Sequence, residues 1–162
     1  YGLLQGLIKE IQDSQDLELQ LVVAGMHLSP EFGLTYREIE KDGFEISRTI
    51  DMQLTSDTPV GIAKSLGLGT IGFGEAFHAL KPEILVLLGD RFELLAAASA
   101  ALVALIPIAH IHGGELTEGA YDDAIRHSIT KMSHLNFTAN EGYRSRVVQL
   151  GEQPSKVLSV GA

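Results

Sequence analysis

Residues that could carry acid–base chemistry and bind a charged ligand are concentrated between Gly89 and His134. This segment holds an acid–arginine pair, an HxHGGE cluster and a DDxxRH sequence at the start of a predicted helix. Carboxylates and imidazoles can accept or donate protons, and arginine can bind phosphate oxygens through two parallel N–H bonds. These residues follow apolar strands or begin helices, so we predict that they face a ligand-binding cleft. They are Asp90, Arg91, His110, His112, Glu115, Asp122, Asp123, Arg126 and His127.

The elements that must position these residues alternate along the chain. Short apolar runs predict strands, and apolar residues at helical spacing predict helices. The predicted strands cover residues 19–24, 44–50, 84–88, 106–111, 136–139 and 157–160. The predicted helices cover residues 2–14, 31–41, 60–80, 91–105, 122–135 and 141–150. This alternation predicts an α/β fold with a doubly wound, Rossmann-like parallel sheet that helices cover on both faces.

Length and composition indicate a single globular domain. The chain has 162 residues, of which 45% are hydrophobic and 20% are charged, with no internal repeat or linker. A net charge of -9 argues against nucleic-acid binding, which needs a dense array of lysine and arginine. No apolar run is long enough to cross a membrane. The absence of cysteine fits a reducing compartment, so we expect a cytoplasmic protein, and we expect no cofactor.

Both ends of the sequence fall inside the predicted fold. A doubly wound sheet normally begins with a strand that becomes central, whereas this sequence begins on a helix. It closes with VLSVGA, a strand and a glycine of the kind at which a chain crosses into another domain. We therefore expect residues 1–162 to be one N-terminal domain that lacks its first strand and a second domain.

A GxGxxG pattern at Gly67, Gly69 and Gly72 is typical of dinucleotide sites. Such a site needs a strand directly before the first glycine, but residues 62–66 are predicted to be helical. We therefore expect these glycines to let a helix pack closely against its neighbours.

Asp90 and Arg91 follow the apolar run ILVLLG, at the carboxyl end of a predicted strand. Open α/β sheets bind ligands at this edge. Asp90 could act as a base or bind a sugar hydroxyl, and Arg91 could bind a phosphate. The structural alternative is that Asp90 caps the next helix. We favour the functional interpretation.

His110 and His112 leave their strand on the same face, because side chains alternate along a strand. An HxH pair could bind a metal with Glu115, Asp122 or His127 as further ligands. However, two glycines bend the backbone directly afterwards, and no HExxH helix completes such a site, so no metal is predicted. We expect His110 to be a core histidine bonded to a carbonyl and His112 to be functional.

Asp122 and Arg126 lie one helical turn apart and could form a routine ion pair. The loop before them, TEGAY, could instead place both beside Asp90 across the cleft. His78 and His134 are interpreted as structural, and His27 is ambiguous.

With these residues assembled, the chain resembles the N-terminal domain of the hydrolysing UDP-N-acetylglucosamine 2-epimerases of sialic-acid biosynthesis. The segments that carry the resemblance are GMHLSPEFG, KPEILVLLGDRFE, HIHGGELTEG, DDAIRHSITKMSHL and the final VGA, in family order. The resemblance implies a two-domain enzyme like the B-type glycosyltransferases, with its active site between the domains. It also implies a basic loop before Tyr1, a UDP-binding domain after Ala162 and a homo-oligomer.

The reaction implied by the resemblance converts UDP-N-acetylglucosamine to N-acetylmannosamine and UDP. UDP is first eliminated to leave 2-acetamidoglucal, and water is then added. Asp90 and Asp122 carry over as catalytic acids, and Arg91 and Arg126 as substrate contacts. His27 and His127 are further candidates for substrate binding.

One position departs from the family pattern. His112 stands where many relatives carry the glutamate of an HxE sequence, and the nearest acid is Glu115. Either side chain could perform the acid–base step. The alternatives for the whole protein are a related epimerase of a UDP-2,4-diacetamido-trideoxy sugar and a metal-dependent phosphoesterase that uses Asp90, His110, His112 and Glu115. We expect negligible turnover by the 162 residues alone.

Overall fold

A computed structural model describes residues 1–52, 57–118 and 121–161, and it confirms the predicted alternation of helices and strands. The strands are β1 (Leu21–Ala24), β2 (Ile46–Ile50), β3 (Leu85–Leu88), β4 (Ile108–Ile111), β5 (Leu135–Thr138) and β6 (Val157–Ser159). The α-helices are α1 (Gln5–Asp13), α2 (Tyr36–Lys41), α3 (Pro59–Leu80), α4 (Phe92–Val103), α5 (Asp122–Met132) and α6 (Glu141–Gln149). Parts of the polar stretch before α3, of the TEGAY loop and of the closing VGA lie outside the described residues.

All strand pairs are parallel, as continuous apolar strands predict, but they form two groups. β1 pairs with β2, and the larger sheet has the order β3-β4-β5-β6. The predicted α/β fold with a parallel, Rossmann-like sheet is confirmed, although β1 and β3 are not hydrogen-bonded to each other within the described residues. The two groups are joined by side chains instead, since Val22 and Ala24 of β1 pack against the same core cluster as Leu85 and Leu87 of β3.

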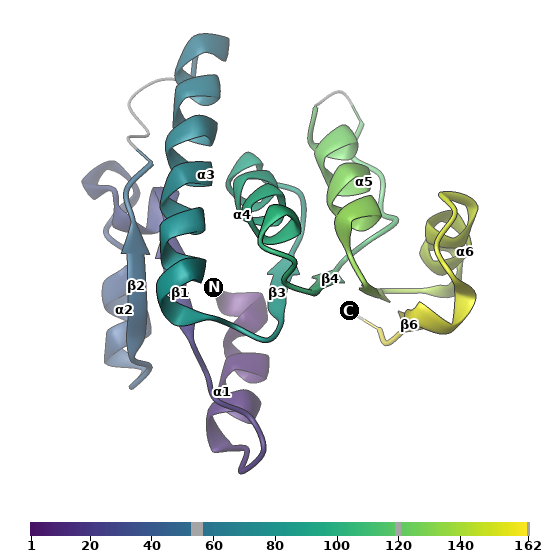
Figure 1. Cartoon of the computed structure of the whole chain (residues 1–162), viewed down its shortest axis with the longest axis horizontal. Helices are drawn as coiled ribbons and strands as arrows, with labels where there is room; N and C mark the ends of the chain where they lie inside the picture. Colours follow the sequence, from purple (N-terminus) through teal and green to yellow (C-terminus); the bar gives the residue numbers. More distant parts are fainter. Residues whose placement is uncertain (53–56, 119–120, 162) are drawn as a thin grey trace.

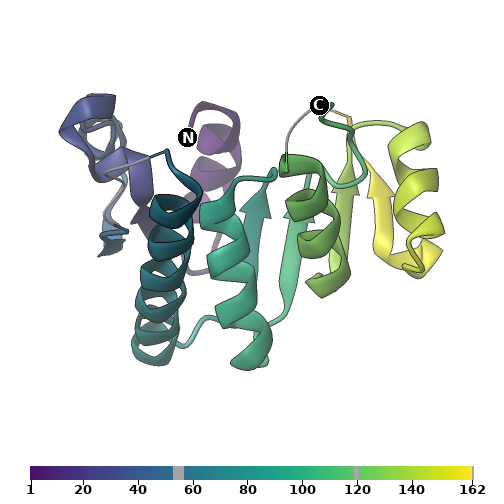
Figure 2. The same cartoon turned by 90° about the horizontal axis from the view of Figure 1, so that it is seen from above.

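The helices lie on both faces of the strands. Figure 1 shows α3, α4 and α5 side by side on one face and α1 on the other, and Figure 2 shows the same division after a turn of 90°. In Figure 2, β3 and β4 point the same way, so the loops that lead to α4 and α5 gather at one edge. This edge is where the sequence predicts the ligand site.

The main core lies between these helices and the strands. α4 presents a row of buried alanines, and Ile108 of β4 and Ile129 of α5 are fully buried. Small side chains let α4 lie close to its neighbours at the packing density of a protein interior. A second cluster, made by Ile8, Val23, Ile39 and Phe44, fixes α1 and α2 on β1 and β2.

The glycines of the GxGxxG pattern lie in the middle of α3, and no strand leads directly into them. A Cβ atom at Gly69 would meet Met52 and Ala96, and one at Gly72 would meet Ile50. The prediction that these glycines allow close helix packing is confirmed for Gly69 and Gly72 but not for Gly67, where a Cβ atom would meet nothing within 4 Å.

The predicted helix over residues 31–41 is only partly correct. A 3-10 turn covers Pro30–Phe32, and the α-helix begins at Tyr36. Between them Gly33 and Leu34 have φ angles of 82° and 51°, which a right-handed helix cannot contain.

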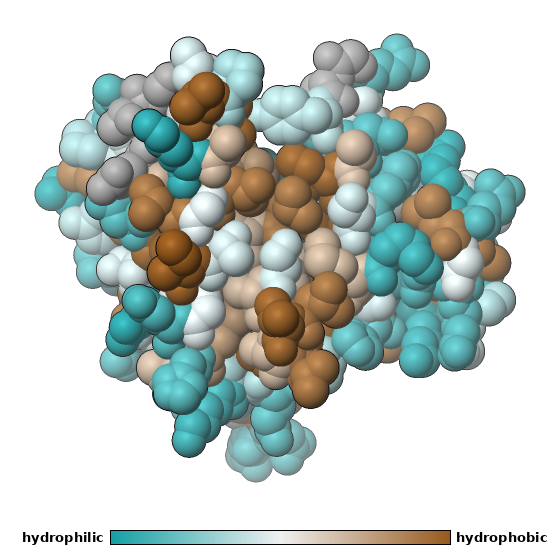
Figure 3. Space-filling view, turned by 45° about the horizontal axis from the view of Figure 1, so that its top comes forward, coloured by the Kyte–Doolittle hydropathy of each residue, from teal (hydrophilic) through white to brown (hydrophobic). Residues whose placement is uncertain are grey.

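Several large apolar side chains remain exposed on α3 and at the end of α4, among them Ile71, Val103 and Leu105. Figure 3 shows apolar residues gathered at the centre of this face with hydrophilic residues around them. Within the described part of the chain, no helix is both long and apolar enough to cross a membrane.

Candidate active site

The ends of two adjacent strands and the start of one helix bring the predicted residues together. Asp90 lies two residues beyond β3, and His112 directly follows β4. β3 and β4 are parallel neighbours, so both residues emerge at the same edge of the sheet. α5 begins at this edge and contributes Arg126 one turn along the helix.

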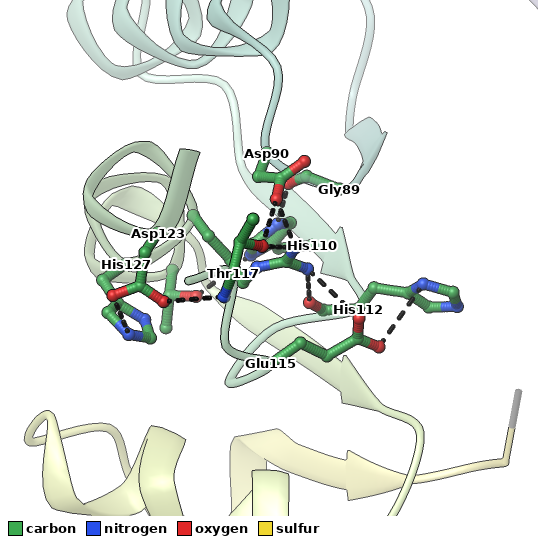
Figure 4. A network of polar contacts seen from close by, with 10 residues as sticks. Gly89, Asp90, His110, His112, Glu115, Thr117, Asp123 and His127 are labelled. Atoms are coloured by element: carbon green, nitrogen blue, oxygen red, sulfur yellow. Dashed lines mark hydrogen bonds and ion pairs between the residues drawn. The ribbon is translucent and has the colours of Figure 1, made fainter. Parts of the chain in front are cut away.

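Arg126 is the centre of a polar network that Figure 4 shows in detail. Its side chain is only 7% exposed, and Nη2 donates to Oδ2 of Asp90. Nη1 donates to the carbonyl oxygen of His112 at 2.8 Å and lies 3.4 Å from Oε2 of Glu115. One guanidinium therefore holds the ends of both strands and the HxHGGE turn in a fixed arrangement.

Thr117 is a member of this network that sequence reasoning missed. Its hydroxyl accepts from Nη2 of Arg126 at 3.2 Å and donates to Oδ2 of Asp90 at 3.3 Å. Its backbone N–H donates to Oδ1 of Asp123 at 3.4 Å. A lone threonine in a loop has no sequence signal of its own, although its place two residues after Glu115 puts it near the motif.

The cap interpretation of Asp90 is wrong. The N-cap residue of α4 is Arg91, and no side chain caps this helix end. The Asp90 carboxylate instead turns to Arg126 and Thr117, and its side chain stays 20% exposed. A carboxylate that is held from one side and open on the other is suited to contact a ligand.

His110 is a core histidine, as predicted. It is fully buried, Nε2 donates to the carbonyl oxygen of Gly89 at 2.8 Å, and Nδ1 lies 3.1 Å from the hydroxyl of Thr130. Burial lowers the pKa of His110 to about 4, against an opposing effect of the Gly89 carbonyl, and Arg126 lowers it further. The ring therefore stays neutral and serves as a link between β3, β4 and α5.

This buried histidine predicts a loss of stability in mild acid. Unfolded histidine has a pKa near 6.5, so below this pH the unfolded chain binds a proton that the folded chain refuses until about pH 4. We expect His110 to remove about 2 kcal/mol from the free energy of unfolding between pH 7 and pH 5. Urea denaturation of wild type and His110→Gln at both pH values measures this difference. His78→Gln, on the exposed side of α3, is the matched control and should behave as wild type, whereas an equal pH response in His110→Gln would contradict the prediction.

The turn after His112 depends on Gly114. Its φ is 77°, and a Cβ atom there would lie 2.4 Å from the carbonyl oxygen of Tyr143 and 2.9 Å from Cγ2 of Val147. Arg146 of α6 donates to the Gly114 carbonyl, so the turn is fixed from both sides. The two glycines therefore bend the chain as the sequence predicts.

Gly114→Ala is expected to destabilise the protein by about 2–4 kcal/mol, since it adds left-handed strain to a clash with backbone. Gly74→Ala is the matched control, because Gly74 lies within α3 and a Cβ there meets nothing within 4 Å. This control should raise stability by up to about 1 kcal/mol. Equal unfolding free energies for the two variants would show that the turn has more room than the structure gives it.

Asp122 and Arg126 do not form the helical ion pair considered above. Arg126 reaches Asp90 and Glu115, while Asp122 lines a separate cleft of about 330 Å³. Arg126 therefore contacts Asp90, as expected, while Asp122 lines the same cleft as Arg91, the residue that follows Asp90. The cleft is lined by Met26, Glu31, Phe32, Asp57, Ile62, Ser65, Arg91, Phe92, Tyr121 and Asp122.

Arg91 lines the cleft and directly follows Asp90 of the Arg126 network, so the cleft and the network are adjacent. Nε lies 3.2 Å from Oε2 of Glu93, and Nη2 lies 3.2 Å from the sulfur of Met26. The side chain remains 53% exposed, which leaves its guanidinium accessible to an anion. Sequence reasoning did not single out Met26, Tyr121 or Glu93, since apolar lining and a buried acid have no motif.

Two predicted substrate-binding residues remain, His27 and His127. His27 is half-buried, and Nδ1 lies 2.7 Å from the hydroxyl of Thr35. Burial lowers the pKa of His27. His127 lies 3.5 Å from Asp123, the acid that receives the Thr117 N–H. His134, whose Nδ1 accepts from the backbone N–H of Ile108, is structural as predicted.

The alternative of a metal-dependent phosphoesterase requires a group of side chains that can bind a metal ion. Across residues 1–52, 57–118 and 121–161, no three His, Asp or Glu side chains form a group that could hold a metal ion. His110, which that alternative requires, uses both ring nitrogens in contacts with protein.

Comparison with known proteins gives consistent matches over almost the whole chain. The family model described as UDP-N-acetylglucosamine 2-epimerase matches residues 9–162. The GDP/UDP-N,N'-diacetylbacillosamine 2-epimerase (hydrolyzing) of Campylobacter jejuni is 51% identical over 160 residues, which are 99% of this chain and 41% of that protein. The UDP-N,N'-diacetylbacillosamine 2-epimerase (hydrolyzing) of Legionella pneumophila is 40% identical over 100% of this chain and 43% of its own.

The fold is also found among solved structures. The crystal structure of UDP-GlcNAc 2-epimerase from Neisseria meningitidis, bound to UDP-GlcNAc, has a TM-score of 0.82 at 18% sequence identity. The match covers 98% of this chain and 42% of that one. The chain thus spans about two fifths of the length of the proteins that it matches.

Proposed function

Since the chain belongs to the UDP-N-acetylglucosamine 2-epimerase family, we propose that it forms one wall of the active site of a hydrolysing nucleotide-sugar 2-epimerase. The observation that carries this proposal is the arrangement of Asp90, Arg126, Glu115 and His112 at the carboxyl ends of β3 and β4. Ligands of open α/β sheets bind at this edge. The cleft beside it has a volume of about 330 Å³, within the usual range for small-molecule sites.

The chemistry of the reaction accounts for these residue types. The proton on C2 of the sugar is weakly acidic, so its removal requires a positioned base while the C1–O bond to UDP breaks. Addition of water to the resulting double bond requires a proton donor. Asp90 and Asp122 supply carboxylates from separate elements, and Arg91 is placed to bind the diphosphate through its guanidinium.

We propose that the sugar is a 2,4-diacetamido-trideoxy hexose carried on a nucleoside diphosphate. Support comes from the Campylobacter and Legionella relatives, which are 51% and 40% identical and are named for N,N'-diacetylbacillosamine. Further support comes from Met26, Phe32, Phe92 and Tyr121 in the cleft, because these side chains can pack against acetamido and C6 methyl groups. UDP-N-acetylglucosamine is the second candidate, favoured by the description of the family model.

Steady-state assays of the intact enzyme with each nucleotide sugar test this choice. Release of the nucleotide is followed by a coupled assay, and the C2 configuration of the free sugar is read by proton NMR. We expect kcat/KM for the diacetamido sugar to exceed that for UDP-N-acetylglucosamine at least tenfold, which corresponds to about 1.4 kcal/mol. A preference for UDP-N-acetylglucosamine would assign the second candidate, and turnover of neither sugar would overturn the proposed function.

We also propose that catalysis needs more than these 162 residues. The matched relatives are more than twice as long, and the cleft is bounded here by one Rossmann-like unit. A polypeptide of residues 1–162 should release no UDP above the uncatalysed rate under conditions in which the intact enzyme turns over. Turnover by this polypeptide within tenfold of the intact enzyme would refute the proposal.

A further inference from the structure

The imidazole of His112 and the carboxylate of Glu115 form a pair at the outer end of the network. Nδ1 of His112 lies 3.5 Å from Oε1 of Glu115, and the second carboxylate oxygen lies 3.4 Å from Nη1 of Arg126. Figure 4 shows the Glu115 side chain extended toward the His112 ring. The side chains of His112 and Glu115 are 23% and 24% exposed, so a ligand can reach the pair.

The backbone conformation of His112 indicates that its side chain has a role other than packing. Its φ is 65°, a left-handed conformation that is uncommon for a residue with a Cβ atom. This conformation directs the His112 carbonyl to Nη1 of Arg126 at 2.8 Å, while the His112 N–H donates to Phe137 at 2.9 Å. Both contacts are made by backbone, and glycine would make them without strain. The imidazole itself contributes to neither.

From this geometry we propose that His112 is a catalytic base of the epimerase and that Glu115 is a positioning residue that acts through it. The inference rests on the proposed function. The Glu115 carboxylate, held by Arg126 and 3.5 Å from Nδ1 of His112, favours the tautomer with the proton on Nδ1 and the free lone pair on Nε2. Arg126 thereby supports two acids with different tasks, Asp90 through Nη2 and Glu115 through Nη1.

The step assigned to His112 is the removal of the C2 proton. The C2–H bond breaks and its proton moves to Nε2, while the electron pair of that bond forms the C1–C2 double bond. The C1–O bond breaks with its pair, which leaves on the β-phosphate oxygen of UDP. In the second half-reaction, water supplies hydroxide to C1 and a proton is added to C2, so one water is consumed for each sugar released. The imidazolium returns its proton to solvent.

The charged and titratable groups near His112 come from several elements. Glu115 lies in the turn after β4, His110 on β4, Asp90 after β3, Arg126 on α5 and Arg146 on α6, where it donates to the Gly114 carbonyl. Glu115 is the acid that contacts the ring, so removal of its charge should act on His112 more strongly than any other single change.

Three variants of the intact enzyme test the pair. His112→Asn removes the base but keeps a residue that tolerates the left-handed backbone. His112→Glu restores the carboxylate of the family HxE pattern. Glu115→Gln keeps the shape of the positioning residue and removes its charge. His78→Asn, on the exposed side of α3, is the control and should retain wild-type rates.

We expect His112→Asn to lower kcat by about 10²–10⁴-fold with little change in KM, and to raise the primary isotope effect of substrate deuterated at C2. His112→Glu should recover activity to within about tenfold of wild type, with the acidic limb of the pH profile moved toward the lower pKa of glutamate. Glu115→Gln should lower kcat about 10–100-fold in wild type. In the His112→Glu background the same substitution should be neutral or beneficial, because it then removes a like charge.

Near wild-type kcat in His112→Asn would overturn the inference and leave the proposed function intact, since the parent enzyme still turns over. A Glu115→Gln loss of equal size in both backgrounds would overturn the positioning role of Glu115. Absence of turnover in wild type with every nucleotide sugar would instead be a failure of the proposed function.

Discussion

Arg126→Met is expected to destabilise the protein by about 3 kcal/mol and to abolish turnover by the intact enzyme. The substitution removes the cation that serves Asp90 and Glu115 and leaves the His112 carbonyl without its donor. Breaking one partner of a buried ion pair typically costs 3–5 kcal/mol, because the other charge stays behind uncompensated. The side chains of Asp90 and Glu115 are about one fifth exposed, so water partly stabilises the charges that Arg126 would leave behind. We therefore expect a loss of stability at the lower end of that range.

Urea denaturation and steady-state kinetics measure the two effects. Arg37→Met is the matched control, since Arg37 is exposed and its guanidinium lies over the Tyr36 ring, 5.9 Å from the ring centre. It should cost at most about 0.5–1 kcal/mol and leave kcat unchanged. Arg126→Lys keeps the positive charge but lacks the two Nη groups that bind separate partners. Compared with Arg126→Met, it should therefore recover part of the stability and little of the activity. A loss below 1 kcal/mol in Arg126→Met would show that the network does not stabilise the fold.

Asp90→Asn is expected to lower kcat by about 10³-fold while the protein stays folded. Asparagine preserves the volume of the side chain and can still accept from Arg126 and Thr117, but it can neither transfer a proton nor carry charge. General acid–base groups contribute 10²–10⁴-fold to the rates of enzymes. We therefore expect the larger effect on kcat and a change of less than about 1–2 kcal/mol in unfolding free energy.

Kinetics and denaturation of the same protein preparation separate these effects. Asp13→Asn is the control, because Asp13 is 61% exposed and pairs with Lys9 at the far end of α1. Its kcat should equal that of wild type. A tenfold or smaller loss in Asp90→Asn would remove Asp90 from the catalytic residues and leave it as an anchor for Arg126.

The two substitutions should not be additive in stability. Asp90 and Arg126 are in contact, and residues in contact commonly show coupling energies of 0.5–3 kcal/mol. Once Arg126 is absent, neutralising Asp90 removes an uncompensated charge. The double variant should therefore be more stable than the sum of the single losses predicts.

Local patterns in the sequence determined the order of the elements and the edge at which chemistry is placed. Apolar runs such as ILVLLG have the length and composition of buried parallel strands, so β3 and β4 and the position of Asp90 and His112 after them followed directly. The glycines of α3 could be assigned to packing because their helical context is itself a local property. The helix over residues 31–41 was misplaced because the left-handed pair at Gly33 and Leu34 has no apolar periodicity to reveal it.

Which side chains Arg126 and Glu115 contact was decided only by the tertiary structure. From the sequence, Arg126 could pair with Asp122 on its own helix or with Asp90 on another element, and Glu115 could be near His112 or far from it. Ile125 and Ile129 are buried, and this orients α5 so that Arg126 lies against the ends of β3 and β4. Asp122, the first residue of α5, lines the cleft. Helical spacing sets only which residues share a face. The rotation of that face, and the path of the loop that brings Thr117 to it, result from packing between segments far apart in the sequence.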